Sequence, residues 1–222
     1  MNGFDSKLVI CGDYRHPRQM LNDQTYDGHV SIHDDKMAED LGFSGAPIEG
    51  PTHFSQFVPL LAEVFGQPWF ETGCISSHYL NMVVEGEEVR AFVERPAEGA
   101  LITRIWAEKR DGTPVLSGTA SVGAGDELSE LDQRRAKLKA SDQLVILSKL
   151  SVGMKGKKDE LVSMGFDQNM GDLYPFSLND KLRGITELSS WYTAEGGSDS
   201  PWGRAIIPLE MISVLTQYSS RE

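Results

Sequence analysis

Residues 44–65 have the sequence SGAPIEGPTHFSQFVPLLAEVF. The first part is rich in turn-forming residues. From Thr52 onward apolar side chains recur at spacings of three and four, which is typical of a helix with one broad apolar face. These side chains are Phe54, Phe57, Val58, Leu61, Val64 and Phe65. Pro51 suits the first turn, whereas Pro59 interrupts the hydrogen-bond ladder. A buried, kinked helix over 52–65 is therefore predicted.

The sequence on either side of this helix has different periods. Upstream, residues 37–42 predict a short helix that ends at a glycine. Downstream, apolar and polar residues alternate, as in half-buried strands. Strands are predicted over 79–84, 89–93, 101–109 and 115–122. Asp111-Gly112 is a strong reverse-turn signal between the last two strands. A buried helix followed by an antiparallel meander predicts an α+β fold in which a curved antiparallel sheet wraps the central helix.

The composition excludes several classes of protein. The chain has 222 residues, of which 40% are hydrophobic and 24% charged, so a packed globular core is expected. The formal net charge of -12 repels nucleic acid and anionic lipid, and neither is expected as a partner. Cys11 and Cys74 lack metal-ligand spacing, so no disulfide framework and no metal are expected. No apolar run approaches the roughly 20 residues of a membrane span, and no signal peptide is apparent, so a cytoplasmic protein is expected.

Three segments are predicted along the chain. Residues 1–126 hold the helix and the sheet, and residues 127–178 form a linker and helical segment whose basic run is expected on a solvated face. In 179–222 a glycine and a proline again precede an apolar helix, over 209–218, which predicts a partial second repeat of the first unit. This copy has no room for its own sheet, so we expect it to cover the groove of the first unit.

Over residues 26–123 the chain resembles the hotdog superfamily, and within it the MaoC-like, (R)-specific enoyl-CoA hydratases. The resemblance depends on the order of several motifs. They are Gly42-Phe43 at a helix end, Gly-x-x-Ile-x-x-Pro-Thr from Gly45 to Thr52, Phe65-Gly66-x-Pro-Trp69, and the strand pair joined by Asp111-Gly112. The resemblance implies a hotdog fold and a lyase that adds water to, or removes it from, an enoyl thioester or similar conjugated carbonyl of the acyl-CoA type, without a cofactor. A homodimer or higher homo-oligomer is expected, because a single wrapped sheet leaves exposed edges.

The catalytic motif of that family, Gly-Asp-x-Asn-Pro-x-His, is altered in this chain. The corresponding run, residues 26–35, is YDGHVSIHDD. One register places Asp27 on the family's aspartate but Ile32 on its histidine. A slip of one residue places His33 on the histidine but Gly28 on the aspartate. Asp27 and His33 are therefore candidate acid–base residues of a degenerate motif, and the register stays open.

A second candidate catalytic pair lies where the predicted helix begins. Glu49 precedes the helix and His53 follows four residues later, so both side chains share one face of an α-helix. Amides near Gly50 are candidate donors to the substrate carbonyl, because the first turn leaves them unpaired. The structural alternative is that Glu49 caps the helix dipole and that His53 is a core or interface residue whose polar atoms are satisfied.

Three further residues are candidates for substrate binding. Trp69 and Tyr79 are either the lining of an acyl tunnel or part of the core. Arg104 either meets the phosphates of a CoA carrier or is a solvated strand residue. The preferred function is a hydratase or dehydratase. The alternatives are a hotdog thioesterase in which Glu49 activates water, and a non-catalytic acyl-binding subunit paired with an active homologue.

Overall fold

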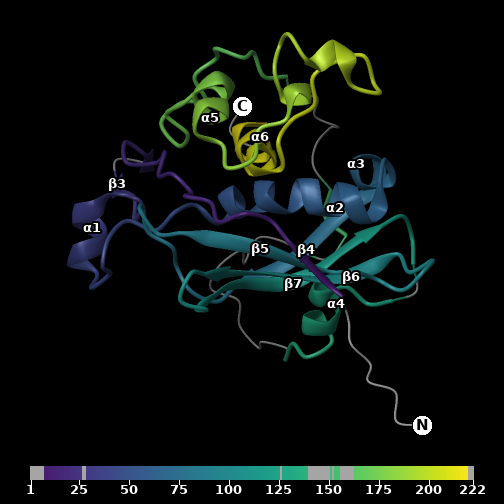
Figure 1. The fold of residues 1–222 in the computed structure, drawn as a ribbon. Coiled ribbons are helices and arrows are strands. Elements are labelled where there is room, and N and C mark those ends of the chain that lie inside the picture. The colour runs from purple at the N-terminus through teal and green to yellow at the C-terminus, as the bar shows by residue number, and fades with distance from the viewer. Residues whose placement is uncertain are drawn as a thin grey trace.

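The computed structural model describes residues 8–26, 29–125, 127–139, 151, 153–155 and 163–219. These residues form three layers (Figure 1). A five-stranded antiparallel sheet is the first layer, a helical segment beginning at Gly50 crosses one of its faces, and the C-terminal residues lie on the other side of that segment. The chain is therefore an α+β protein with the hotdog arrangement that the resemblance implies.

The sheet has the strand order β1-β5-β6-β7-β4, and all neighbouring strands are antiparallel. The strands are β1 (Val9–Cys11), β4 (Gly73–Tyr79), β5 (Val89–Glu94), β6 (Ile102–Lys109) and β7 (Pro114–Val122). Buried and less buried residues alternate along β5, as its sequence predicts. Gly112 takes a φ of 86° in the turn between β6 and β7, which confirms the predicted hairpin.

The strand predicted over 79–84 is wrong in position. β4 ends at Tyr79, where that prediction begins, and it pairs with β7 from Gly73↔Val122 to Tyr79↔Leu116. The apolar residues that follow lie in a loop, where Val83 is buried in the core and Val84 forms an isolated bridge to Pro47. Val83 is thus a core residue that lies outside the sheet.

The predicted helix over 52–65 has two parts. It is a 3-10 helix, η1 (Gly50–Phe57), followed directly by an α-helix, α2 (Val58–Phe65), and then by α3 (Pro68–Thr72). Pro59 lies in the first turn of α2, where its missing N–H costs nothing. An α-helix that began earlier would require that N–H and would clash with the proline ring. The kink expected at Pro59 is therefore a change of helix type.

The main core lies between this helical segment and the sheet. Phe57 and Leu61 are fully buried and pack against inward-facing residues of β5, β6 and β7. Those strand residues include Val89, Ala91, Val93, Ile105, Ala107, Val115, Leu116 and Ala120. Residues that alternate along strands thus meet residues that recur at helical spacing, which confirms the central arrangement predicted from the sequence.

The N-terminal residues add a small hairpin and a helix at one end of the central segment. The hairpin is β2 (Thr25–Tyr26) with β3 (His29–Val30), and the helix is α1 (Asp35–Asp40). Asp34 caps α1 by accepting a hydrogen bond from the Met37 amide at 2.9 Å. Gly42 follows the helix with a φ of 87°, as the predicted helix end requires.

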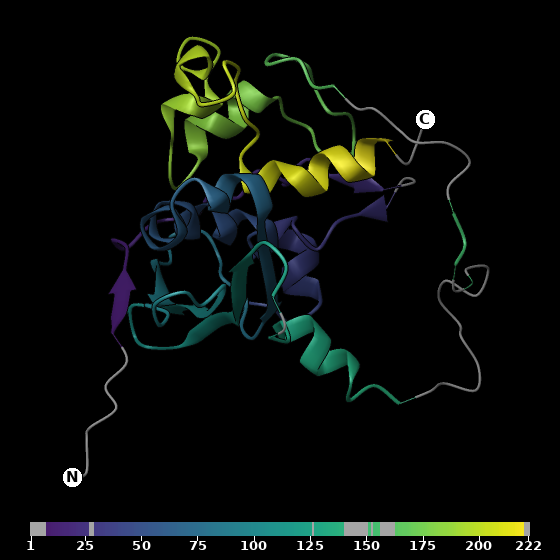
Figure 2. The same ribbon diagram turned by 90° about the vertical axis from the view of Figure 1, so that its right-hand side faces the viewer.

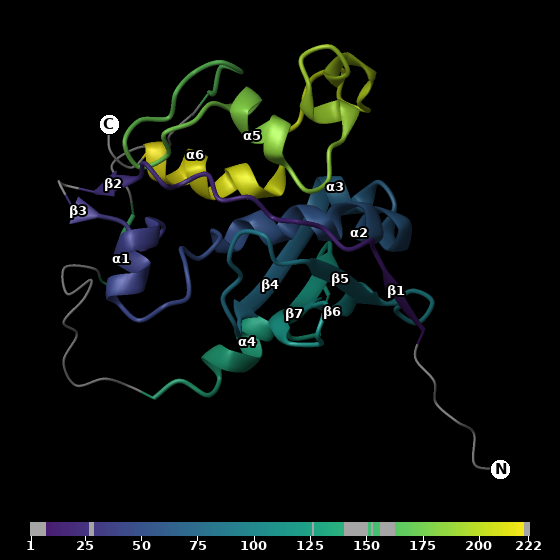
Figure 3. The same cartoon turned by 60° about the vertical axis from the view of Figure 1, so that its left-hand side comes forward.

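The C-terminal residues cover the face of the helical segment that points away from the sheet (Figure 2). Their elements are α5 (Leu178–Gly184), η2 (Ser190–Tyr192), η3 (Gly197–Asp199), η4 (Leu209–Met211) and α6 (Ile212–Ser219). Helix α6 and α5 lie above the central segment and α1 lies to one side (Figure 3). Residues 163–219 contain no strand, so the second repeat and the segment boundaries stay predictions.

On the outer side of the sheet, α4 (Glu130–Arg135) packs against β4, and the Glu130 carboxylate lies 3.3 Å from the His78 ring. Cys11 and Cys74 are both free and exposed. No helix within the described ranges has the length and apolar character needed to cross a bilayer.

Candidate functional site

The geometry of η1 decides which of its side chains lie together. In a 3-10 helix, side chains three residues apart eclipse each other. Glu49, the residue before η1, therefore forms one row with Thr52 and Ser55, and the Glu49 carbonyl accepts the Thr52 amide at 3.0 Å. His53 belongs to a different row. The common face expected for Glu49 and His53 assumes α-helical spacing and does not apply here.

The row that begins at Glu49 meets a buried ion pair from the C-terminal layer. The Nζ atom of Lys181 lies 2.7 Å from Oε2 of Glu210, and the side chains are 2% and 0% exposed. Lys181 also donates to Oγ1 of Thr52 at 3.4 Å, and the Ser55 hydroxyl donates to Oε1 of Glu210. Buried charges are tolerated only when they are paired and hydrogen-bonded, so these hydroxyls help to hold the pair in place.

Glu49 lies at the edge of this charged cluster and is itself partly buried. Burial raises the pKa of Glu49, and the nearby Glu210 carboxylate acts in the same direction. The Lys181 ammonium and a hydrogen bond from Tyr174 oppose that rise without cancelling it. Glu49 thus keeps its proton to a higher pH than a solvated glutamate does, which suits a carboxyl group that donates and accepts protons near neutrality.

Tyr79 closes over the first residue of η1. A Cβ atom built on Gly50 would lie 2.4 Å from Cζ of Tyr79 and 2.6 Å from its hydroxyl oxygen, so only glycine leaves room for this ring. The ring stacks on Phe54 with the ring centroids 6.3 Å apart, and Tyr79 as a whole residue is 48% exposed. Burial of the hydroxyl and the charge of Glu49 raise the pKa of Tyr79. The hydroxyl is therefore a hydrogen-bond donor at neutral pH beside Glu49.

His33 reaches the same loop from the N-terminal side. Its Nδ1 atom lies 2.6 Å from the carbonyl oxygen of Pro47, two residues before Glu49, and Gln19 donates to the same carbonyl at 2.8 Å. The contact with a carbonyl requires Nδ1 to carry the proton, so Nε2 is free to accept one. Burial lowers the pKa of His33, and the bond to Pro47 opposes this only in part. Asp27 lies outside the described residues.

His53 is buried at 3% exposure on the second row of η1, with Gln56 three residues later. Burial and the charge of Lys181 lower the pKa of His53 to about 4, so its ring is neutral at neutral pH. Its Nδ1 atom and both polar side-chain atoms of Gln56 have no hydrogen-bond partner among the described residues. His53 is therefore buried as the core interpretation expects, but its Nδ1 atom lacks, among the residues that the structure describes, the partner that this interpretation requires.

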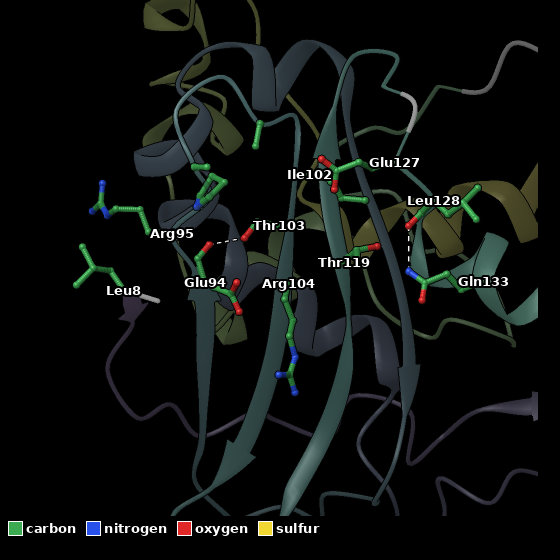
Figure 4. A pocket seen from close by; sticks show the side chains of 13 residues that line it. Leu8, Glu94, Arg95, Ile102, Thr103, Arg104, Thr119, Glu127, Leu128 and Gln133 are labelled. Atoms are coloured by element: carbon green, nitrogen blue, oxygen red, sulfur yellow. Dashed lines mark hydrogen bonds between the residues drawn. The ribbon is translucent and has the colours of Figure 1, made fainter. Parts of the chain in front are cut away.

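The structure separates Trp69 and Arg104 from this site. Trp69 is 5% exposed and belongs to the core cluster, so its role is packing within the core. Arg104 follows the buried Thr103 and precedes the buried Ile105, so it points to the outer face of β6, away from η1. There its guanidinium lies over the Trp106 ring, and it lines an open groove of about 610 Å³ (Figure 4).

Sequence reasoning missed the two charged residues of the C-terminal layer. Glu210 stands alone in the apolar run IIPLEMI at 206–212, and a single charge within such a run is a signal of a buried, paired group. Lys181 lies in LNDKLRG, which resembles any solvated helix and gives no such signal. Within the described part of the chain, no group of three or more His, Cys, Asp or Glu side chains is placed to hold a metal ion.

No protein-family model and no curated protein sequence matches the chain. Among solved structures, it is similar to an (R)-hydratase from A. caviae involved in PHA biosynthesis, with 18% identity, a TM-score of 0.35, and coverage of 53% of this chain and 95% of that one. It is also similar to the R-hydratase PhaJ1 from Pseudomonas aeruginosa, with 16% identity, a TM-score of 0.38, and coverage of 64% of this chain and 89% of that one. A third similar structure is an N-terminal dehydratase from the difficidin assembly line, with 13% identity, a TM-score of 0.29, and coverage of 55% of this chain and 40% of that one. Identities and TM-scores this low assign no role to any side chain of this chain. The role of each side chain therefore has to be inferred from the geometry of this chain.

Proposed function

We propose that this chain is a hydratase or dehydratase of an enoyl thioester or a similar conjugated carbonyl compound. One observation carries the proposal: the loop before η1 contacts a proton acceptor, His33, and contains a proton donor, Glu49. The Pro47 carbonyl orients His33 so that Nε2 is the basic atom, and Glu49, two residues later, is a carboxyl group with a raised pKa. Their pKa values are displaced toward each other, as acid–base catalysis near neutral pH requires.

In the hydration direction, neutral His33 accepts a proton from water while the water oxygen bonds to the β-carbon of the substrate. The electron pair of the double bond then moves toward the carbonyl, and protonated Glu49 delivers its proton to the α-carbon. One molecule of water is added. The proton on His33 exchanges with solvent, and Glu49 regains a proton from solvent. Dehydration follows the same steps in reverse.

The carbonyl oxygen of the substrate gains negative charge during this reaction and needs donors. The Tyr79 hydroxyl, held over Gly50 beside Glu49, is one such donor. In the first turn of η1, Pro51 has no N–H, and the Thr52 amide already donates to the Glu49 carbonyl. The Gly50 amide is therefore the backbone donor of this turn that we assign to the carbonyl oxygen of the substrate.

The test is turnover of short and long trans-enoyl thioesters, followed by loss of the conjugated absorbance. We expect Glu49→Gln and His33→Gln each to lower kcat/KM by roughly 10²-fold or more, the range of a lost acid or base. Glu63→Gln and His16→Gln are matched controls, because both side chains are exposed and lie on other elements. Equal activity of Glu49→Gln and Glu63→Gln would contradict the proposal.

The same assay separates the two alternatives. Release of free thiol without hydration, abolished by Glu49→Gln and unaffected by His33→Gln, would identify a thioesterase. Binding of acyl-CoA without any turnover would identify an acyl-binding subunit. The acyl-CoA carrier, the cytoplasmic location and a homodimer remain parts of this proposal, and for the dimer the support is that β4 is an edge strand of the sheet.

A further inference from the structure

We infer that Lys181, held in place by Glu210, is a positioning residue for Glu49, so that the C-terminal layer completes the site on the central helix. The catalytic consequence of this inference rests on the proposed function, but the electrostatic relation between the three groups does not. Lys181 and Glu210 both lie outside the sequence motifs at the start of the central helix.

The position of the Lys181 ammonium is fixed from two sides. Glu210 lies 2.7 Å away, and its other carboxylate oxygen accepts the Ser55 hydroxyl of η1. Thr52, also on η1, accepts a hydrogen bond from the ammonium at 3.4 Å, and the Phe176 ring lies 5.5 Å below it. Both charges are therefore attached to the row of η1 that begins at Glu49.

The charge balance of this cluster determines where a proton resides. One ammonium and two ionised carboxylates leave one negative charge uncompensated in a buried place, which is unfavourable. Glu210 has both the Lys181 ammonium and the Ser55 hydroxyl as direct partners. Glu49 faces Lys181 of α5, Glu210 of η4, Tyr174 before α5 and Tyr79 of β4. The charges of Lys181 and Glu210 therefore shift the ionisation of the Glu49 carboxyl group.

Stability alone does not account for charges at positions 181 and 210. A buried ion pair is often no more stabilising than apolar side chains of similar volume. The ammonium, however, attracts the Glu49 carboxylate, and the Glu210 carboxylate repels it. Together they keep Glu49 from being held permanently in its protonated form by burial, which a group that both gives and takes a proton requires.

The experiment is an NMR titration of the Glu49 side-chain carboxyl carbon in the full chain, assigned by the signal that Glu49→Gln removes. Lys181→Met removes the attracting charge, and we expect the Glu49 midpoint to move to higher pH. Glu210→Gln removes the repelling charge, and we expect the midpoint to move to lower pH. A merely structural role for the pair would not produce shifts of opposite sign.

A second variant guards against misfolding, because Lys181→Met leaves Glu210 buried and unpaired. In Lys181→Met/Glu210→Leu both charges are absent, and the Glu49 midpoint is expected between those of the wild type and of Lys181→Met. Lys109 and Glu87 form a matched control pair, with Nζ and Oε1 also 2.7 Å apart but on the sheet. Lys109→Met and Glu87→Gln should leave the midpoint of Glu49 unchanged.

The outcomes distinguish this inference from the proposed function. If the wild type hydrates a thioester, the pH–rate limb assigned to Glu49 should move in the same direction as the NMR midpoint in each variant. If no substrate is turned over but the midpoints move as expected, the proposed function fails and the control of Glu49 by Lys181 stands. An unchanged midpoint in the double variant overturns the inference, whether or not the protein is active.

Discussion

The two sides of the helical segment 50–65 are buried in different ways. The side that faces the sheet carries apolar residues such as Phe57 and Leu61, which pack against apolar strand residues. The side that faces the C-terminal layer carries Thr52 and Ser55, which hold a buried lysine and glutamate. One short segment is thus covered on one side by packing and on the other by a polar network.

The difference shows what each contact requires of its partner. An apolar contact tolerates exchange for another apolar residue of similar volume, and its energy depends mainly on the area buried. A buried charge requires one particular partner in one particular place, and loss of that partner leaves an uncompensated charge. We therefore expect substitutions on the two sides to differ in size, in pH dependence and in their response to a second substitution.

The largest effect is expected on the polar side. Glu210→Leu alone should lower the free energy of unfolding by about 4 kcal/mol, because it leaves the Lys181 ammonium buried without its counter-ion. Lys181→Met/Glu210→Leu should recover most of that loss, since the double variant has no unpaired charge. Urea unfolding of both variants measures this. If the double variant is as unstable as the single one, the pair acts through packing and the contrast between the two sides disappears.

A smaller loss is expected on the apolar side. Leu61→Ala removes a fully buried side chain from the core between the helix and the sheet, which should cost about 3 kcal/mol. Leu188→Ala is the control, because Leu188 is 61% exposed. Urea unfolding at pH 6 and pH 8 should give the same loss for Leu61→Ala. A loss that changes with pH would mean that the core also supports the charged cluster.

The smallest effect concerns His53, which lies between the two sides. Its pKa falls from 6.5 in the unfolded chain to about 4 in the folded one, mainly through burial, so the unfolded state binds more protons between these values. The stability contributed by neutral His53 is complete above pH 6.5 and is lost as the pH falls, by about 2 kcal/mol at pH 5. His53→Gln should remove this part of the acid sensitivity, as measured by thermal unfolding between pH 5 and 8. The exposed His16, changed to Gln, should leave it in place.

Much of the apolar side could be predicted from the sequence. Spacings of three and four located the central helix, and alternation located β5, β6 and β7. β4 was misplaced because the sequence CISSHY alternates weakly, since the strand lies at the edge of the sheet and is only partly buried. Periodicity reports burial on one face, so it is weakest where neither face is fully covered.

The polar side could be predicted only in part. Glu49, Gly50 and Tyr79 were recognised as candidates from the start of the helix and the strand that follows. The grouping with Lys181 and Glu210 was not, because these contacts join η1 to residues 129 and 155 positions away in the sequence. For Trp69 and Arg104 the residue type leaves both a binding role and a structural role open, because only the direction of the side chain decides between them.

The change of helix type at Pro59 also sets a length. Eight residues of a 3-10 helix extend about 16 Å, whereas eight residues of an α-helix extend about 12 Å. By fixing where the α-helix begins, the proline lets the eight residues of η1 extend farther than one α-helical segment of equal length would, so Glu49 lies farther from α2 along the helix axis.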